Sequence, residues 1–288
     1  MSNPVILITG ANGQLGSELR ALQAKYPAYQ LMGTDRNTLP IQDAAAVESW
    51  FAQHQPAFCI NAAAYTAVDK AETNEADAYD INATATGILA AACAAHGTKF
   101  IHVSTDYVFN GSSADPYTED QPTDPINVYG ASKLKGEELA REQNPDSIII
   151  RTAWVYSEFG NNFVKTMLRL MKERESLNVV SDQVGAPTYA ADLASAIMQI
   201  IDGGQWKAGI YHYSNQGRIS WYDFAVAIRD LSGLSCAVNP IPSAQYPTPA
   251  RRPSFSLLDT HKIKTTFGLS IPEWKESLRV CLHQLNQG

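Results

Sequence analysis

Short apolar runs that alternate with helix-like segments narrow the fold of this chain more than any other feature. Five such runs occupy 5–10, 29–35, 58–64, 99–105 and 147–156. Runs without polar alternation are typical of parallel strands buried on both faces. Helical segments lie between them, among them one that follows Asp43 as its N-cap and one from about Glu75 to Ala95. Because repeated βα units need right-handed crossovers, the pattern predicts a doubly wound parallel α/β sheet of the Rossmann type.

After about residue 155 the alternation becomes less regular. We expect residues 1–155 to form mainly a dinucleotide-binding domain and residues 156–288 mainly a smaller C-terminal substrate-binding lobe, with segments crossing between the two. Prolines cluster in 239–253, which predicts an ordered loop with few backbone donors.

Composition excludes several classes of partner. The net charge is −7, so we expect neither a nucleic acid nor a membrane surface as partner. The four cysteines are far apart and form no CxxC pair, which favours buried thiols in a reducing compartment: Cys59, Cys93, Cys236 and Cys281. No run approaches membrane-spanning length, and the first residues lack the pattern of a signal peptide. A cytoplasmic location is therefore the expectation.

Three glycines follow the first apolar run. Gly10, Gly13 and Gly16 lie where a strand would turn into a helix. Glycine allows the backbone to turn tightly and to approach a diphosphate, whose charge the helix N-terminal amides then meet. Asp35, at the end of the second run, is placed to accept a hydrogen bond from a ribose 2′-hydroxyl. The alternative is a tight turn without a ligand, but the strand before and the helix after it favour dinucleotide binding.

Tyr129 and Lys133 are one helical turn apart. Taken alone, this segment fits a solvated helix in which a tyrosine lies along a lysine stem. Beside a dinucleotide, a lysine is expected to lower the pKa of the phenol and make it a usable proton donor for carbonyl reduction. Ser104 and Thr105, at the end of the fourth run, provide hydroxyls to hold the carbonyl oxygen.

Together these motifs resemble the extended short-chain dehydrogenase/reductase superfamily and, along nearly the whole chain, the dTDP-4-dehydrorhamnose reductase family. The segments that carry this resemblance are 61–72, 104–111, 127–137, 151–156, 160–169, 182–194 and 246–253. It implies NAD(P)H-dependent reduction of the 4-keto group of a dTDP-deoxyhexulose, giving dTDP-L-rhamnose. The catalytic residues that it implies are Thr105, Tyr129 and Lys133. The expected cofactor-binding residues are Gly10, Gly13, Gln14, Leu15, Gly16, Asp35, Arg36, Ile41, Ala63, Ala64, Tyr65, Thr66, Tyr129 and Lys133. The expected substrate-binding residues are Thr105, Asp106, Tyr107, Trp154 and Arg252.

Arg252 is also expected from chemistry, because an acidic protein that binds a diphosphate needs a local guanidinium. Asp35 favours a free 2′-hydroxyl while the adjacent Arg36 can pair with a 2′-phosphate, so both NADH and NADPH are expected to serve.

The chain departs from the family pattern in two places. Pro40 precedes Ile41 where relatives carry an acidic residue, which removes an adenosine-side contact. Some relatives bridge subunits through magnesium held by glutamates, but here only Glu18 is kept, and Ala191 and Gln284 stand at the other positions. Magnesium is therefore not expected, and a homodimer stays open.

Two other functions remain as alternatives. One is a different sugar-nucleotide enzyme of the superfamily, an epimerase or a dehydratase. Dehydratases carry adjacent Asp and Glu after the strand-end threonine, whereas Tyr107 occupies the second place here. The other alternative is a non-catalytic, NADP-binding regulatory subunit, which the intact Thr105, Tyr129 and Lys133 set argues against.

Overall fold

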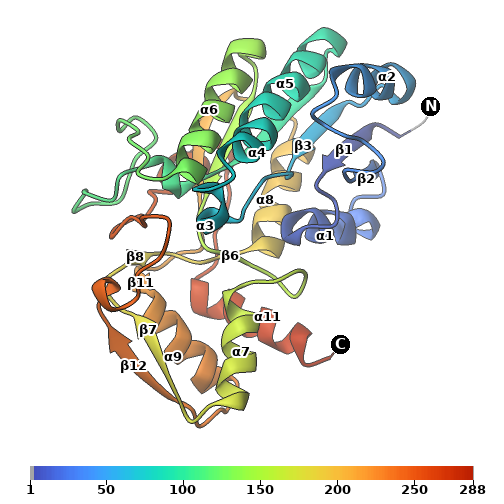
Figure 1. Ribbon diagram of the computed structural model, residues 1–288. Coiled ribbons are helices and arrows are strands. Elements are labelled where there is room, and N and C mark those ends of the chain that lie inside the picture. Colours follow the sequence, from blue (N-terminus) through green and yellow to red (C-terminus); the bar gives the residue numbers. More distant parts are fainter. Residues whose placement is uncertain (1–2, 288) are drawn as a thin grey trace.

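A six-stranded parallel sheet forms the centre of the computed structural model, which describes residues 3–287 (Figure 1). Its strands are β1 (Val5–Thr9), β2 (Gln30–Thr34), β3 (Phe58–Asn61), β4 (Lys99–Thr105), β5 (Ile148–Thr152) and β10 (Gly209–Tyr213). They lie in the order β10-β5-β4-β3-β1-β2, so the direction of winding reverses between β1 and β3. Ligands of such sheets bind beyond the carboxyl ends of the strands at this reversal. The predicted doubly wound α/β fold is confirmed.

Helices cover both faces of the sheet (Figure 1). One face carries α2 (Ala44–His54), α5 (Ala85–His96) and α6 (Val128–Gln143), which pack side by side over an apolar cluster. The other face carries α1 (Gln14–Ala21) and α8 (Ala190–Asp202). Two short helices, α3 (Val68–Ala71) and α4 (Glu75–Tyr79), follow the carboxyl end of β3.

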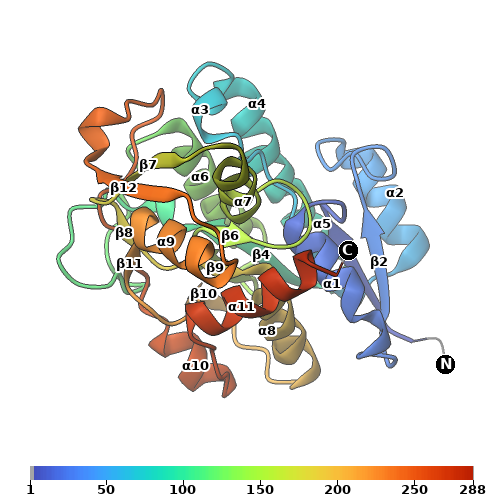
Figure 2. The ribbon, with the colours of Figure 1, turned by 90° about the horizontal axis from the view of Figure 1, so that it is seen from below.

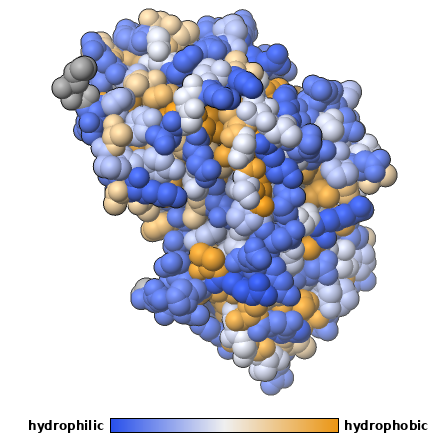
Figure 3. Space-filling view, turned by 180° about the vertical axis from the view of Figure 1, so that it is seen from behind, coloured by the Kyte–Doolittle hydropathy of each residue, from blue (hydrophilic) through white to orange (hydrophobic). Residues whose placement is uncertain are grey.

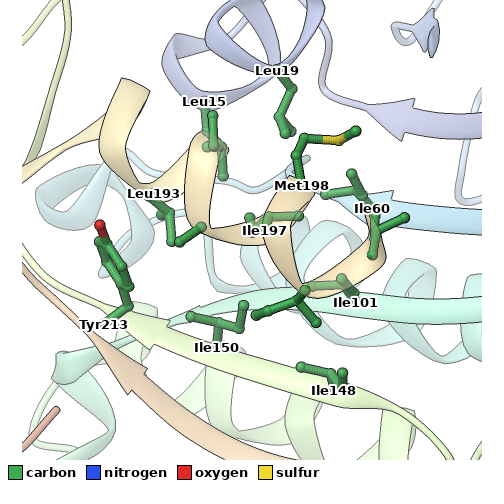
Figure 4. Close-up of a cluster of buried hydrophobic side chains, with 14 of the residues drawn as sticks. Leu15, Leu19, Ile60, Ile101, Ile148, Ile150, Leu193, Ile197, Met198 and Tyr213 are labelled. Carbon is green, nitrogen blue, oxygen red and sulfur yellow. The ribbon is translucent and has the colours of Figure 1, made fainter. Parts of the chain in front are cut away.

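Helix α8 comes from the second half of the chain, yet it closes the core of the main sheet. Figure 4 shows Leu193, Ile197 and Met198 of this helix lying between α1 and the sheet residues Ile60 and Ile101. All five side chains are buried. The chain then adds β10 to the edge of the sheet beside β5, in parallel register. The division between residues 155 and 156 stays a prediction. Two segments of the second half belong with the main sheet: α8 packs on its face, and β10 forms its edge strand.

The remaining elements form a smaller lobe below the carboxyl ends of the strands (Figures 1 and 2). Its own apolar core lies among α7 (Phe163–Glu173), α9 (Trp221–Leu231), α11 (Trp274–Leu285) and the parallel pair β7 (Ser176–Val180) and β12 (Ala237–Ile241). The shorter strands are β6 (Val155–Tyr156), β8 (Val184–Gly185), β9 (Thr188–Tyr189) and β11 (Ile219–Ser220), while α10 (His261–Phe267) packs beside β10.

Three segments differ from their sequence predictions. The run 147–156 is two strands rather than one, because Trp154 adopts a left-handed conformation (φ 50°) that breaks it. The helix expected from Glu75 to Ala95 contains a π-helical turn, η2 (Asp80–Thr84). The expected loop 239–253 begins as the end of β12, where Pro240 is tolerated because the two-stranded pair leaves one edge unpaired.

On the face seen from behind, hydrophobic residues lie scattered among hydrophilic ones (Figure 3). Within residues 3–287, no helix combines the length and the apolar character needed to span a membrane.

Candidate active site

The glycine turn lies between β1 and α1, at the reversal of the sheet. Gly10 has a φ of 65°, and a Cβ there would lie 2.7 Å from backbone atoms of Ala63 after β3. A Cβ on Gly16 would lie 2.3 Å from the Gly10 carbonyl oxygen, so Gly16 allows α1 to start close to the strand. Gly13 is the N-cap of α1, and no side chain caps the helix. The first amides of α1 are thus available to an anion such as a diphosphate.

A cavity of about 1070 Å³ opens beside this turn. Its wall contains thirteen of the fourteen residues expected to bind cofactor: Gly10, Gly13, Gln14, Leu15, Asp35, Arg36, Ile41, Ala63, Ala64, Tyr65, Thr66, Tyr129 and Lys133. The exception is Gly16, which packs behind the turn. The glycine-rich turn, the uncapped start of α1 and the cavity volume fit a dinucleotide.

Asp35 presents a fixed carboxylate at the end of β2. Its Oδ1 accepts hydrogen bonds from the amides of Asn37 and Thr38, and its Oδ2 accepts one from Asn12. Hydrogen bonds from Thr38 and Asn37 hold the pKa of Asp35 below its ordinary value. The carboxylate is therefore charged at neutral pH, next to Arg36 on the cavity wall.

The wall after β3 is fixed by Asn82, a buried residue of the π-helical turn. Its Oδ1 accepts from the Tyr65 amide at 2.8 Å, and its Nδ2 donates to the Tyr65 carbonyl at 3.1 Å and to Ser132 Oγ of α6 at 2.9 Å. One side chain thus joins the loop with the expected cofactor contacts to the helix that carries Tyr129. No sequence pattern indicates this role of Asn82, because its partners are 17 and 50 residues away.

Helix α6 begins at Val128 because Asn127 accepts a hydrogen bond from the Gly130 amide. Tyr129 and Lys133 then share its face toward the cavity. Burial raises the pKa of Tyr129 to about 12, against a smaller lowering by the neighbouring Thr105 side chain. The expectation that Lys133 lowers the pKa of the phenol is wrong for this state of the protein, because burial dominates.

Lys133 is itself buried, and its ammonium group is directed at the sheet. Its Nζ donates to the Val103 carbonyl at 2.7 Å and lies 3.3 Å from His102 Nε2. Burial lowers the pKa of Lys133 to about 8, opposed in part by the charge of Glu137.

The two hydroxyls at the end of β4 have different partners. Ser104 Oγ donates to Glu137 Oε1 at 2.5 Å, within a buried pair in which Arg151 contacts both Glu137 oxygens. Thr105 instead contacts Tyr129, and its Oγ1 lies 3.1 Å from Asp106 Oδ1. Of the two hydroxyls, that of Thr105 is therefore the one beside the Tyr129 phenol.

Asp106 and Tyr107 continue this wall away from the cavity. Asp106 is buried, its Oδ2 has no hydrogen-bond partner among the described residues, and burial raises its pKa to about 6. Tyr107 meets Tyr129 edge-on, with ring centroids 5.8 Å apart. An unpartnered buried oxygen beside two phenols is a ready acceptor for a hydroxyl group of a ligand.

Trp154 follows β5 in its left-handed conformation and stacks on Trp221 of α9, with ring centroids 3.7 Å apart and planes 14° from parallel. Both rings are partly exposed. A strained tryptophan held against a second one forms a flat apolar surface at the end of the sheet. Trp154 was predicted from the sequence, whereas Trp221, far away along the chain, was not.

Arg252 forms an ion pair with Asp69 of α3. Its Nη1 and Nη2 donate to the two oxygens of Asp69, at 3.0 and 2.9 Å. The pair lowers the pKa of Asp69 and lies near Tyr107 and the exposed Tyr246. None of the five residues expected to bind substrate (Thr105, Asp106, Tyr107, Trp154 and Arg252) lines the 1070 Å³ cavity itself.

The structure brings together no group of three or more His, Cys, Asp or Glu side chains suited to a metal ion within residues 3–287. Glu18 is buried and bonded to Ser157 Oγ at 2.7 Å.

Comparison with known proteins identifies the family. The model of the RmlD substrate binding domain matches residues 4–287. A dTDP-4-dehydrorhamnose reductase of Aggregatibacter actinomycetemcomitans is 44% identical over 95% of this chain and 97% of its own. The chain belongs to the dTDP-4-dehydrorhamnose reductase family.

Solved structures of the family agree closely with this fold. A dTDP-4-dehydrorhamnose reductase of Clostridium acetobutylicum superposes with a TM-score of 0.94 at 43% identity, covering 98% of this chain and 99% of its own. One from Bacillus anthracis, solved in complex with NADP, has a TM-score of 0.94 at 38% identity and covers 98% and 100%.

Proposed function

We propose that this protein reduces the 4-keto group of dTDP-4-dehydro-L-rhamnose with NADPH or NADH, giving dTDP-L-rhamnose. The observation that carries the proposal is the position of Tyr129. It lines the same cavity as the glycine turn after β1, in a chain 44% identical to a reductase of this name. A proton donor is thereby set beside a dinucleotide-sized cavity.

The cofactor side of the site follows from the cavity wall. The α1 amides receive the diphosphate, Asp35 accepts from the adenosine ribose, and Lys133 and Tyr129 meet the nicotinamide ribose. When bound, the reduced nicotinamide supplies the hydride. Arg36 beside Asp35 supports use of both NADPH and NADH, with modest discrimination between them.

Tyr129 supplies the proton. Its pKa of about 12 keeps the phenol protonated at neutral pH, so it has a proton to donate to the oxygen of the reduced carbonyl. Thr105, which contacts this phenol, holds the same carbonyl oxygen. As the phenol loses its proton, a charged Lys133 one turn away stabilises the phenolate.

The sugar nucleotide is assigned to the surface beyond Tyr129. Asp106 Oδ2 accepts a sugar hydroxyl, and Tyr107 and Trp154 provide ring faces for the pyranose. Arg252 serves the diphosphate by exchanging part of its contact with Asp69 for phosphate oxygens. A cytoplasmic location and assembly as a homodimer stay predictions, and light scattering tests the second.

The test follows NADPH absorbance with freshly made dTDP-4-dehydro-L-rhamnose. Tyr129→Phe keeps nearly all the packing volume, so we expect a fold and an NADPH affinity close to wild type, with turnover lower by roughly 10²–10⁴-fold. Equal turnover by the two proteins would show that the tyrosine is structural. NADPH binding without turnover in wild type supports the regulatory-subunit alternative, and water loss from dTDP-glucose at an enzymatic rate supports a dehydratase.

A further inference from the structure

A buried chain of polar side chains runs beneath the cofactor cavity, across β1, β3 and β4. It joins Thr9, Asn61, His102 and Lys133, whose exposed fractions are 1%, 0%, 0% and 2%. Thr9 and Lys133 also line the cavity. The proposed mechanism uses Lys133 and leaves His102 without a role, although a fully buried imidazole needs a reason to be there.

The hydrogen bonds determine the orientation of the Asn61 amide. Thr9 Oγ1 accepts a hydrogen bond from the Ala63 amide at 3.4 Å and donates one to Asn61 Oδ1 at 2.7 Å. On the other side, Thr86 Oγ1 donates to the Asn82 carbonyl and so accepts from Asn61 Nδ2. The amide nitrogen of Asn61 therefore faces His102.

This orientation fixes the tautomer of His102. Asn61 Nδ2 lies 3.1 Å from His102 Nδ1, which must accept this hydrogen bond. Burial and the charge of Lys133 hold the pKa of His102 well below its ordinary value, so the ring is neutral with one proton. That proton is on Nε2, directed at Lys133 Nζ 3.3 Å away.

Two donors therefore face one another whenever Lys133 carries its third proton, whereas a neutral amine can accept from His102 Nε2–H. The other groups around Lys133 do little to offset this. Val103 offers one carbonyl, Tyr129 is a neutral phenol, and the charge of Glu137 is compensated by Arg151 at 2.7 Å. From this geometry we propose that His102 is a positioning residue that holds Lys133 partly neutral in the free protein, so that Lys133 takes up a proton when NADPH binds.

The physical reason for uptake is the new environment that the cofactor brings. Ribose hydroxyl oxygens accept from the ammonium, and the phosphates add negative charge, so the charged form of Lys133 binds NADPH more tightly. Because the pKa of free Lys133 is about 8, its charged fraction falls about tenfold between pH 7 and pH 9. The phosphates of NADPH are already ionised in this range.

The inference rests on the proposed cofactor site. Measuring the dissociation constant of NADPH as a function of pH distinguishes a failure of that site from a failure of the inference. Absence of NADPH binding at pH 7 refutes the site itself. We expect wild type to bind NADPH about tenfold more weakly at pH 9 than at pH 7. His102→Gln, whose amide oxygen can turn toward the ammonium, should reduce this ratio to about twofold. An unchanged ratio in His102→Gln overturns the proposal.

Two controls and one direct measurement complete the test. His212→Gln alters another buried histidine, on β10, and should keep the tenfold ratio. Lys133→Met should abolish the pH dependence of NADPH binding. A ratio that persists in this variant would be due to Glu18, whose pKa is also about 8, and not to Lys133. Long-range ¹H–¹⁵N NMR of wild type, which needs no variant to fold, should show His102 protonated on Nε2, and a proton on Nδ1 overturns the proposal.

Discussion

Glu18→Gln is expected to stabilise the protein at alkaline pH. Glu18 lies in α1 and is only 5% exposed. Its Oε1 accepts from Ser157 Oγ at 2.7 Å, and the carboxylates of Glu158 and Asp192 are close enough to repel it. Burial, reinforced by this repulsion, raises the pKa of Glu18 from 4.5 to about 8.

The sign follows from proton binding. Between pH 4.5 and about 8 the folded protein keeps a proton on Glu18 that the unfolded chain releases. Stability is therefore fully retained below pH 4.5 and is lost as the pH rises toward 8. Each pKa unit corresponds to about 1.4 kcal/mol, so the whole shift sets an upper bound of ~5 kcal/mol. Because the side chain can turn partly toward water once it is charged, we expect a loss of about 2 kcal/mol.

Urea unfolding at pH 5 and pH 9 measures this effect. Glutamine keeps the contact with Ser157 and carries no charge, so Glu18→Gln should match wild type at pH 5 and exceed it by about 2 kcal/mol at pH 9. Glu142→Gln, at an exposed position of α6, is the matched control and should show no such difference. The same change in the free energy of unfolding at both pH values would refute the reasoning.

Three further predictions concern the site. A Cβ at position 185 would lie 3.0 Å from the Trp154 ring, so Gly185→Ala should displace the indole and raise KM for the sugar nucleotide, with the Kd for NADPH unchanged in a binding titration. Asp35→Asn removes the charge that repels a 2′-phosphate, so the kcat/KM ratio of NADPH to NADH should rise several-fold; a ratio that falls would contradict this. Asp69→Asn breaks the bidentate ion pair with Arg252 and should lower Tm by a few degrees. The control variant Asp77→Asn, on α4, should leave Tm unchanged.

The main sheet could be predicted from the sequence because its information is local. Each apolar run is bounded by its own turn or helix, and Asp43 caps α2 as expected, accepting from the amides of Ala45 and Ala46. The position of β10 at the edge of the sheet could not be predicted in this way. Residues 209–213 pair with β5, some sixty positions earlier in the chain, and nothing within the run itself distinguishes this partner from a strand of the lobe.

The cofactor side of the candidate site was predictable for the same reason. The glycines and the Tyr129–Lys133 pair act through short spacings, and Gly10, Gly13, Tyr129 and Lys133 line one cavity. The ionisation of Tyr129 was not predictable, because its pKa is raised mainly by burial in the folded protein, which the spacing of Tyr129 and Lys133 does not show. Asn82 and Trp221 could not be predicted, because Asn82 contacts Tyr65 and Ser132 and Trp221 contacts Trp154, all far away in sequence.

The substrate side depends on how the lobe is attached to the main sheet. Asn162 before α7 donates to Gln14 of α1, Ser157 donates to Glu18, and Arg252 pairs with Asp69. Gln14 lies on the cavity wall, so a cofactor at α1 also meets the loop that leads into the lobe. Arg252 is paired with Asp69 of α3, so in the proposed substrate site a diphosphate that draws the guanidinium away would also loosen one of these attachments. If Arg252 binds the diphosphate as proposed, binding of the sugar nucleotide and the position of the lobe are energetically coupled through Asp69, because its carboxylate then competes with the substrate for the same two guanidinium nitrogens.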